Sequence, residues 1–419
     1  MQDNTLARAL RMAGADAVLL PAYTPIRVDE DNVSIDRVFL GGINVYLDSK
    51  LPGWNRLPRF TKRWLDHPGL VRWLSKLNSS TDASALGPLT TDLLKGSLGP
   101  QRGEIQELIR YLCDELKPDT IIFSNALLSG IVPELRQQFS GLTGCLLQGD
   151  DIFLDGLKEP WKTQALRLLA DNAAHFDVLL THSDYYAQFM QRYLGLSAER
   201  FRQVPLTIDD GPAVTEQPSR LHTTVGYFAR ICPEKGAFWF LDAAERVLSQ
   251  RADLQTVIAG YLPEAHRRRF ETRIVGLTES FGSRVQWLGS PDSRQEKFRV
   301  LTSFDWLCVP TEYHEPKGLY VLEAALAGVP SLLPAHGAFP ERISALGTGT
   351  LYDPCDPHAL DEALLNLPPQ RDEGARESLR QRCLQQFGMR KTGVRVLEVL
   401  KSVNETSFGM QSARPHNRL

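Results

Sequence analysis

The feature that most constrains the fold is an almost unbroken alternation of short apolar runs with segments of helical periodicity. Nine apolar runs are typical of buried parallel strands, at residues 17–21, 120–123, 144–148, 176–181, 224–229, 254–260, 285–289, 306–310 and 331–334. Helical periodicity lies between them, at 104–116, 164–174, 238–248 and 319–327. Such repeated alternation predicts an α/β fold, with doubly wound parallel sheets covered by helices on both faces.

The chain divides into two halves of similar length. Its 419 residues exceed one ordinary core. Residues 206–222 are rich in Pro, Gly, Thr and acidic residues and lack a helical stripe, so we interpret them as a linker. We predict an N-terminal domain at 1–205, a C-terminal domain at 223–388, a helix at 389–402 and a loose tail at 403–419. The two domains are expected to face each other across a cleft.

Charge and cysteine content exclude several classes of protein. The 47 basic and 50 acidic residues give a net charge of −3, which argues against nucleic acid as a partner. The six cysteines are scattered singly without zinc-binding spacing, as is typical of free thiols in a reducing compartment. No apolar run reaches the roughly 18 residues needed to cross a bilayer, and the N-terminus lacks a signal-peptide pattern. We therefore expect a cytoplasmic protein.

Residues 51–77 stand apart in composition. They hold three of the seven tryptophans and six basic residues against one acidic residue, Asp66. One interpretation is a pair of amphipathic helices, with Phe60, Trp64 and Trp73 on one face, that contacts an anionic membrane or an acidic acceptor. That interpretation places the protein peripherally at the inner membrane face. The other, which we favour, is an ordinary subdomain whose aromatic residues form its core.

Two glutamates separated by seven residues form the strongest candidate site. Glu315 follows the apolar run at 306–310, and Gly318 and Glu323 lie at the start of the next helical segment. Glu315 is therefore expected at the carboxyl end of a parallel strand, the edge at which open α/β sheets bind ligands. A glycine at a helix start lets backbone N–H groups approach a phosphate, and the helix dipole favours its charge. Carboxylates nearby suit sugar hydroxyls, for which they are hydrogen-bond acceptors.

A second group of residues supplies positive charge to the same edge. The run at 224–229 leads to Arg230, and Lys235 follows Pro233, which suits the first turn of a helix. Two fixed positive charges beside a helix N-terminus would stabilise the charge that develops on a departing diphosphate. Each group alone is more often solvated surface, but their occurrence at the same kind of strand end favours a site.

Together these motifs resemble glycosyltransferase family 4. The resemblance rests on Arg230-x4-Lys235, Glu315-x7-Glu323, residues 327–330 (AGVP) and residues 336–341 (HGAFPE). It covers nearly the whole chain and implies the GT-B fold, in which two Rossmann-like domains face a cleft. It also implies retaining, metal-independent transfer of a sugar from a nucleotide sugar, without a cofactor.

The resemblance further implies roles for individual residues. Arg230 and Lys235 would bind the donor diphosphate and stabilise the leaving group. Glu323 would hold the ribose hydroxyls, and Glu315 would contact hydroxyls of the transferred sugar. The backbone would bind sugar and phosphate at Gly318, Leu319 and Tyr320.

The sequence departs from the family pattern at three places. The usual phenylalanine after the first Glu-Pro is Lys317. The family's initial strand and glycine-rich loop have no counterpart before the helix at 4–12, since Gly41 and Gly42 follow what would be the second strand. A histidine that the family often places near the reacting carbon is replaced by Gln148, which can form hydrogen bonds but cannot act as a base.

The residues after two strands of the first half have competing interpretations. Asp150 and Asp151 either orient an acceptor hydroxyl, together with Gln148, or cap a loop or helix. We interpret Ser183 as the N-cap of a helix at 185–193. A Ser/His/Asp hydrolase is not supported, because the sequence has no G-x-S-x-G motif.

The sequence thus predicts a retaining glycosyltransferase that moves a hexose from a UDP- or GDP-sugar to a hydroxyl group. The acceptor is lipid-linked, a polysaccharide or a small molecule. Two alternatives stay open. One is a non-catalytic GT-B protein that binds a nucleotide sugar or a partner enzyme, and the other is a GT-B enzyme of another reaction, such as an epimerase.

Overall fold

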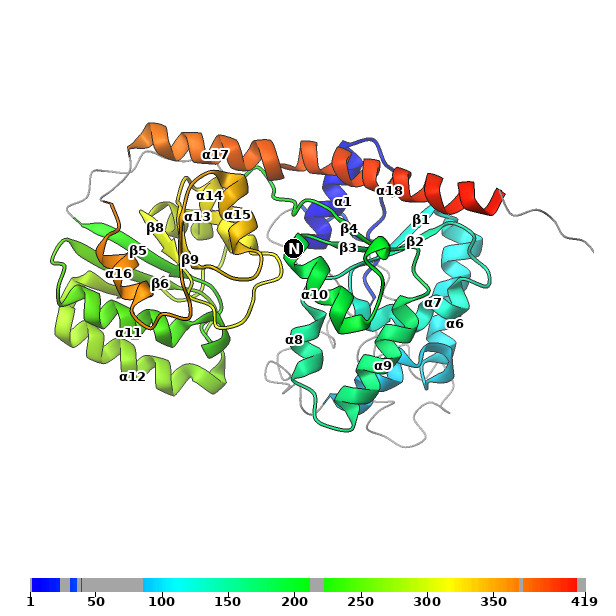
Figure 1. Ribbon diagram of the computed structural model, residues 1–419, viewed down its shortest axis with the longest axis horizontal. Helices are drawn as coiled ribbons and strands as arrows, with labels where there is room; N and C mark the ends of the chain where they lie inside the picture. Colours follow the sequence, from blue (N-terminus) through cyan, green and yellow to red (C-terminus); the bar gives the residue numbers. More distant parts are fainter. Residues whose placement is uncertain are drawn as a thin grey trace, which may run out of the picture.

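The computed structural model describes residues 2–22, 31–35, 39, 86–211, 222–368 and 372–412. These residues form two parallel-sheet α/β domains, and two consecutive C-terminal helices run from one domain to the other (Figure 1). The predicted α/β class is therefore confirmed. The segment at 51–77, the pair Gly41-Gly42 and most of the predicted linker lie outside the described residues.

The N-terminal domain contains a sheet of four parallel strands in sequence order. They are β1 (Thr120–Phe123), β2 (Leu142–Leu146), β3 (Val178–Thr181) and β4 (Phe201–Gln203). Three of them match predicted apolar runs, whereas the short edge strand β4 has two exposed residues and was not predicted. The predicted strand at 17–21 is wrong in extent, because only Leu19 forms a bridge, to Ser34. The run is only partly enclosed, because Val18 is 37% exposed whereas Leu20 packs against the core of the domain.

Helices cover both faces of this sheet. The α-helices are α1 (Gln2–Met12), α5 (Gly87–Leu94), α6 (Arg102–Arg110), α7 (Val132–Leu135), α8 (Asp150–Asp155), α9 (Trp161–Ala173) and α10 (Asp184–Leu194). Shorter helical segments are η4 (Gly96–Leu98), the π-helix η5 (Tyr111–Leu116), η6 (Ala126–Ile131) and η7 (Ala198–Arg200). One apolar core packs beneath α5, α6, α9 and α10, and a smaller one on the other face joins Leu6 of α1 to β2 and β3.

The C-terminal domain contains six parallel strands in the spatial order β10-β9-β8-β5-β6-β7. The strands are β5 (Thr223–Phe228), β6 (Leu254–Ala259), β7 (Val285–Trp287), β8 (Trp306–Cys308), β9 (Ser331–Pro334) and β10 (Thr350–Tyr352). Counted along the chain, this is the doubly wound order of the dinucleotide-binding folds. Five of the strands confirm predicted runs, and the short edge strand β10 was missed.

Helices also enclose this second sheet. They are η8 (Pro233–Lys235), α11 (Ala237–Leu248), α12 (Glu264–Phe281), η9 (Gly282–Arg284), α13 (Arg294–Thr302), α14 (Leu319–Leu326), α15 (Phe339–Leu346), α16 (Ala359–Leu365), α17 (Glu373–Phe387) and α18 (Met389–Ser412). The core between helices and sheet contains the fully buried Trp306, Phe304 and Phe339.

The last helix, α18, returns to the N-terminal domain and packs along α1 (Figure 1). Its apolar stripe, Val396, Leu400 and Val403, joins the core that lies against β2 and β3. The prediction of a loose tail from residue 403 is wrong for residues 403–412, because the stripe continues past the expected end and the helix with it.

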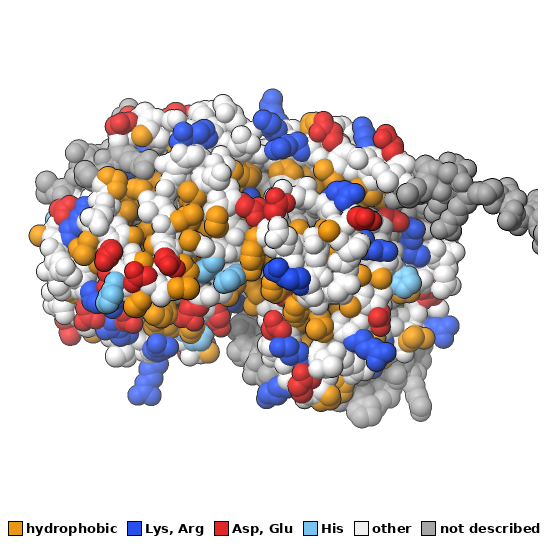
Figure 2. Space-filling model, viewed as in Figure 1, with side chains coloured by type: hydrophobic (Ala, Val, Ile, Leu, Met, Phe, Trp, Pro, Cys, Tyr) orange, Lys and Arg blue, Asp and Glu red, His pale blue; other side chains and the backbone are white. Residues whose placement is uncertain are grey.

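The surface of the described residues is mixed in charge. Acidic and basic side chains are interspersed over the face shown in Figure 2, in line with the near-neutral composition. Within the described part of the chain, no helix combines the length and apolar character that a membrane span requires.

The close approach of α18 to α1 depends on Gly393. A Cβ atom at this position would lie 2.1 Å from the carbonyl oxygen of Ala9. We expect Gly393→Ala to lower the free energy of unfolding by about 1–3 kcal/mol, because the helices must separate. The matched control is Gly276→Ala in α12, where nothing lies within 4 Å. It should gain up to about 1 kcal/mol from helix propensity. Equal midpoints of urea unfolding for the two variants would contradict this packing.

Candidate functional site

The two motif-bearing loops meet where the C-terminal sheet reverses its direction of winding. β5 and β8 are neighbours, but the chain continues from β5 to β6 on one side and from β8 to β9 on the other. This position is the topological switch point of the sheet. Doubly wound sheets bind ligands there, outside the carboxyl ends of the strands. Arg230 and Lys235 follow β5, and Glu315 follows β8. The structure brings the two predicted groups together, with Lys235 Nζ 2.7 Å from Glu315 Oε2.

Gly236 lets the two loops approach each other. Its φ of +68° is in the left-handed region, and a Cβ atom there would lie only 1.7 Å from the carbonyl oxygen of Pro310. Any other residue would therefore force the loop after β5 away from the end of β8. The contact between Lys235 and Glu315 depends on this glycine.

The carboxylate of Glu315 accepts four hydrogen bonds. The donors are Lys235 Nζ at 2.7 Å, the Tyr313 hydroxyl at 2.8 Å, the Gly318 amide at 3.2 Å and the Tyr320 hydroxyl at 3.3 Å. Burial alone would raise the pKa of Glu315, but the Lys235 ammonium and these donors outweigh it, and the pKa lies below its ordinary value of 4.5. Glu315 is thus ionised at neutral pH and fixes the loop that precedes α14.

Lys235 and Arg230 place positive charge at this edge in two different ways. The Lys235 ammonium lies over two aromatic rings, 4.7 Å from the centroid of Tyr313 and 4.9 Å from that of Tyr320, and it also donates to the Tyr313 hydroxyl. Arg230 has an exposed side chain just beyond the end of β5. One cation is held in a fixed position and the other is accessible from the solvent.

Helix α14 begins at Gly318, whose φ of +72° makes it a left-handed N-cap. Leu319 and Tyr320 form its first turn, so their amides are among those that have no acceptor within the helix. Glu323 lies one turn further and pairs with Lys297 of α13 at 3.0 Å. Its side chain borders a small cavity of about 30 Å³ that Thr5 of α1 and other residues also line.

The N-terminal domain reaches this site through Gln148, which follows β2. Its Oε1 accepts a hydrogen bond from Lys317 Nζ at 2.9 Å, and its Nε2 donates to Asp3 Oδ1 at 2.8 Å. The two positions at which the sequence departs from the family pattern, Lys317 and Gln148, are therefore in direct contact across the domain interface. Burial lowers the pKa of Lys317, and the nearby carboxylates of Glu315, Asp3 and Asp150 oppose that shift.

Asp150 and Asp151 are engaged in local contacts. Asp150 accepts hydrogen bonds from the amides of Ala126 and Gln148, both at 3.2 Å. Asp151 accepts one from the Tyr186 hydroxyl. Burial raises the pKa of both carboxyl groups. These contacts hold the start of α8 in place, and a role in acceptor binding stays a prediction.

Ser183 caps α10 as predicted, since its Oγ accepts a hydrogen bond from the Tyr186 amide at 3.2 Å. The same hydroxyl donates to the Pro316 carbonyl at 2.8 Å, a contact between the domains that the sequence did not reveal. Glu341 adds a second one, because its carboxylate accepts from the amides of Asp184 and Tyr185 at 3.0 and 2.8 Å. Glu341 is the last residue of the HGAFPE motif, but nothing in the sequence indicated that it contacts a helix of the other domain.

The C-terminal domain is similar to a family of known proteins. Residues 222–368 match the family described as glycosyl transferases group 1. Over 219 residues the chain is 26% identical to D-inositol 3-phosphate glycosyltransferase of Corynebacterium glutamicum. This match covers 48% of the chain and 50% of that protein, so it spans half the length of the relative.

Solved structures extend the likeness to both domains. Sucrose-phosphate synthase from Thermosynechococcus elongatus has a TM-score of 0.63 at 18% identity, with 95% of this chain and 91% of that one covered. Anabaena Alr3699/HepE in complex with UDP has a TM-score of 0.56 at 16% identity, with 73% and 84% covered. The chain has the GT-B fold. The residues that match the group 1 family, 222–368, include the arginine, lysine and glutamate motifs.

Within this GT-B chain, the described residues contain no group of three or more His, Cys, Asp or Glu side chains placed to hold a metal ion. The charges that face the switch point come instead from Lys235, Arg230 and the start of α14. The expectation of metal-independent chemistry stays a prediction, tested below.

Replacing Glu315 tests its position at the centre of the site. Glu315→Ala removes the acceptor of four donors and leaves the half-buried Lys235 ammonium without a counter-ion. We expect the free energy of unfolding of the C-terminal domain to fall by about 3–5 kcal/mol. Glu315→Gln keeps one acceptor oxygen and should lose less. The control, Glu312→Ala, changes an exposed residue of the same loop and should stay within about 0.5 kcal/mol. Denaturant unfolding followed by tryptophan fluorescence measures all three, and a loss for Glu312→Ala equal to that of Glu315→Ala would contradict the assignment.

Proposed function

We propose that the chain is a retaining glycosyltransferase of family 4 that transfers a hexose from a nucleotide sugar to a hydroxyl acceptor. The observation that carries the proposal is the meeting of Lys235, Arg230 and the N-terminus of α14 at one switch point. Two cations and a helix start give the site the polarity that a diphosphate requires. Alr3699/HepE structures hold UDP and UDP-glucose, which favours a UDP-sugar over a GDP-sugar as donor.

In the proposed complex the donor diphosphate lies between Arg230, Lys235 and the amides at Leu319 and Tyr320. Lys235 is close enough to Glu315 to be oriented by it, so its ammonium can turn toward the phosphate without losing its counter-ion. Glu323 would accept hydrogen bonds from the ribose hydroxyls in place of the Lys297 ammonium. A sugar hydroxyl would take the place of one of the donors on Glu315.

The proposed reaction needs no protein base. The bond between the anomeric carbon and the diphosphate oxygen breaks, and the acceptor hydroxyl forms the new glycosidic bond on the same face of the sugar. The departing phosphate oxygen takes the proton of that hydroxyl, while Arg230 and Lys235 stabilise its negative charge. The trehalose-6-phosphate synthase among the similar structures was studied for transfer with retention. The acceptor would approach from the side of Gln148, Asp150 and Asp151, and a lipid-linked, polysaccharide or small-molecule hydroxyl fits this proposal.

A non-catalytic nucleotide-sugar-binding protein is the second candidate. The contact between Lys317 and Gln148 favours it, because this pair occupies the N-terminal side of the site, from which an acceptor would approach. Release of UDP from UDP-glucose, with and without added acceptors, separates the two candidates. The binding protein would bind the donor and release no UDP.

Nucleotide binding tests the donor site first. We expect UDP at about 100 times its dissociation constant to stabilise the chain by roughly 2.7 kcal/mol, whereas GDP, ADP and CMP stabilise it less. Glu323→Ala and Arg230→Ala should lose this gain. The matched controls are Glu279→Ala and Arg268→Ala, two exposed positions on α12, and they should keep it. Thermal unfolding without metal measures the effect. Equal gains in the site variants and the controls would place nucleotide binding elsewhere.

Metal independence is tested by activity. UDP release from UDP-glucose should proceed at the same rate in EDTA and in Mn²⁺ or Mg²⁺, because the cations of the site are side chains. Lys235→Ala should lower kcat by about 100- to 1000-fold, as removal of one fixed charge-stabilising donor does in other sites. Activity that disappears in EDTA and returns with a divalent ion would rule out this mechanism.

A further inference from the structure

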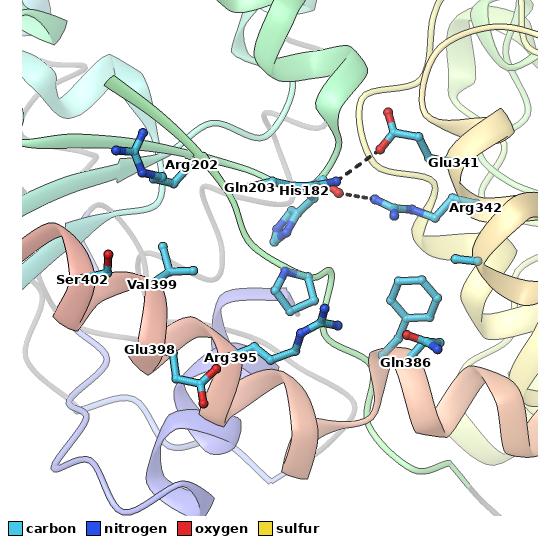
Figure 3. A pocket seen from close by; sticks show the side chains of 13 residues that line it. His182, Arg202, Gln203, Glu341, Arg342, Gln386, Arg395, Glu398, Val399 and Ser402 are labelled. Carbon is cyan, nitrogen blue, oxygen red and sulfur yellow. Dashed lines mark hydrogen bonds between the residues drawn. The ribbon is translucent and has the colours of Figure 1, made fainter. Parts of the chain in front are cut away.

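A cavity of about 540 Å³ lies where the two domains and the C-terminal helix meet (Figure 3). The ends of β3 and β4, helix α15, and the junction of α17 with α18 line it. Its lining includes none of the proposed donor-binding side chains, Arg230, Lys235, Glu315 and Glu323. The volume is in the range of small-molecule binding pockets, about 300–1,000 Å³.

Arg342 presents a buried, incompletely partnered guanidinium group to this cavity. The residue is 3% exposed. Its Nε donates to the Lys317 carbonyl at 2.8 Å and its Nη2 to the His182 carbonyl, whereas its Nη1 makes no hydrogen bond with the described residues. Burial lowers the pKa of Arg342 to about 10, against the opposing effect of Glu341 and Glu315, so the group stays charged at neutral pH. A buried cation whose bonds go only to carbonyls favours the entry of an anion.

Arg395 supplies a second positive charge from α18. It is exposed, makes no hydrogen bond or ion pair with the described residues, and points into the cavity in Figure 3. The acidic residues that line the cavity neutralise little of this positive charge. Glu341 is committed to the start of α10, and Glu398 points away from the centre of the cavity in Figure 3. His182 is buried, and burial, with the positive charges of Lys317 and Arg342, lowers its pKa to about 3, so it stays neutral.

We propose that this interdomain cavity binds a phosphorylated small molecule, with its phosphate between Arg342 and Arg395 and its hydroxyl groups toward Gln386 and Ser402. Two guanidinium groups from different elements match the several oxygens of a phosphate better than the two of a carboxylate. The polar side chains of Gln386 and Ser402 are also among the lining residues, where they can form hydrogen bonds with hydroxyls. The volume accommodates a sugar phosphate.

Occupation of the cavity is coupled to the donor site through Arg342. The Lys317 carbonyl that Arg342 holds lies directly before Gly318, the first residue of the proposed phosphate-binding turn. Both domains line the cavity, so a ligand there favours the arrangement in which they are in contact. Linkage then requires that this ligand and UDP strengthen each other's binding. This coupling rests on the proposed function, whereas the binding itself does not.

Direct binding tests the cavity without the donor. Glucose 6-phosphate is the probe, glucose is its neutral counterpart, and isothermal titration calorimetry is the measurement. Glucose 6-phosphate should bind the wild-type chain and glucose should not. Arg395→Glu should weaken binding at least tenfold, and it should fold normally because Arg395 is exposed and unbonded. Arg390→Glu, the same change at an exposed position of α18 outside the cavity, should leave binding unchanged. Failure of glucose 6-phosphate to bind, or equal binding by both variants, overturns the proposal.

A second titration tests the coupling. The dissociation constant of UDP should fall about fivefold in saturating glucose 6-phosphate, and Arg395→Glu should abolish the change. Competition between the two ligands would show that glucose 6-phosphate occupies the donor cleft and would overturn the cavity assignment. If UDP fails to bind the chain at all, the proposed function is lost, while the loss of glucose 6-phosphate binding in Arg395→Glu still supports the cavity.

Discussion

The contact between the Lys235 ammonium and the Glu315 carboxylate joins the two loops from which the candidate site is built. It forms only because β5 and β8 lie side by side and because Gly236 lets one loop reach the end of the other strand. The carboxylate also bonds the amide of Gly318, so the start of α14 is fixed by the same group. In a buried site such a network is rigid, because a member that moves away leaves its partners without hydrogen bonds, which is costly there.

The two domains are joined around this network by a few polar contacts and one long helix. Pro316 and Lys317, which directly follow Glu315, form hydrogen bonds across the interface with Ser183 and Gln148, while α18 connects the C-terminal domain to α1. Lys317 and Gln148 are two of the positions at which the sequence departs from the family pattern that it resembles. The Lys317 ammonium donates a hydrogen bond and the Gln148 amide oxygen accepts it. The two departures from the pattern are therefore compatible with each other.

Prediction from sequence succeeded where the physical signal was local and strong. Central parallel strands are buried on both faces, so their apolar runs are continuous, and eight of the nine runs correspond to strands of the structure. The short edge strands β4 and β10 lack that signal because part of each is exposed. The end of α18 was missed although Val396, Leu400 and Val403 continue a helical stripe, since that stripe is buried only by a partner far away in the chain.

The sequence by itself determined the α/β class, five of the six strands of the C-terminal sheet and the residue types at their ends, because burial and turn geometry act over short distances. Only the tertiary structure decided which of those ends meet. The order of the strands brought Lys235 to Glu315 and not to another carboxylate. The packing of the domains gave Glu341 the start of α10 as its partner and left Arg342 facing a cavity. These pairings join residues far apart in sequence, and no local pattern encodes them.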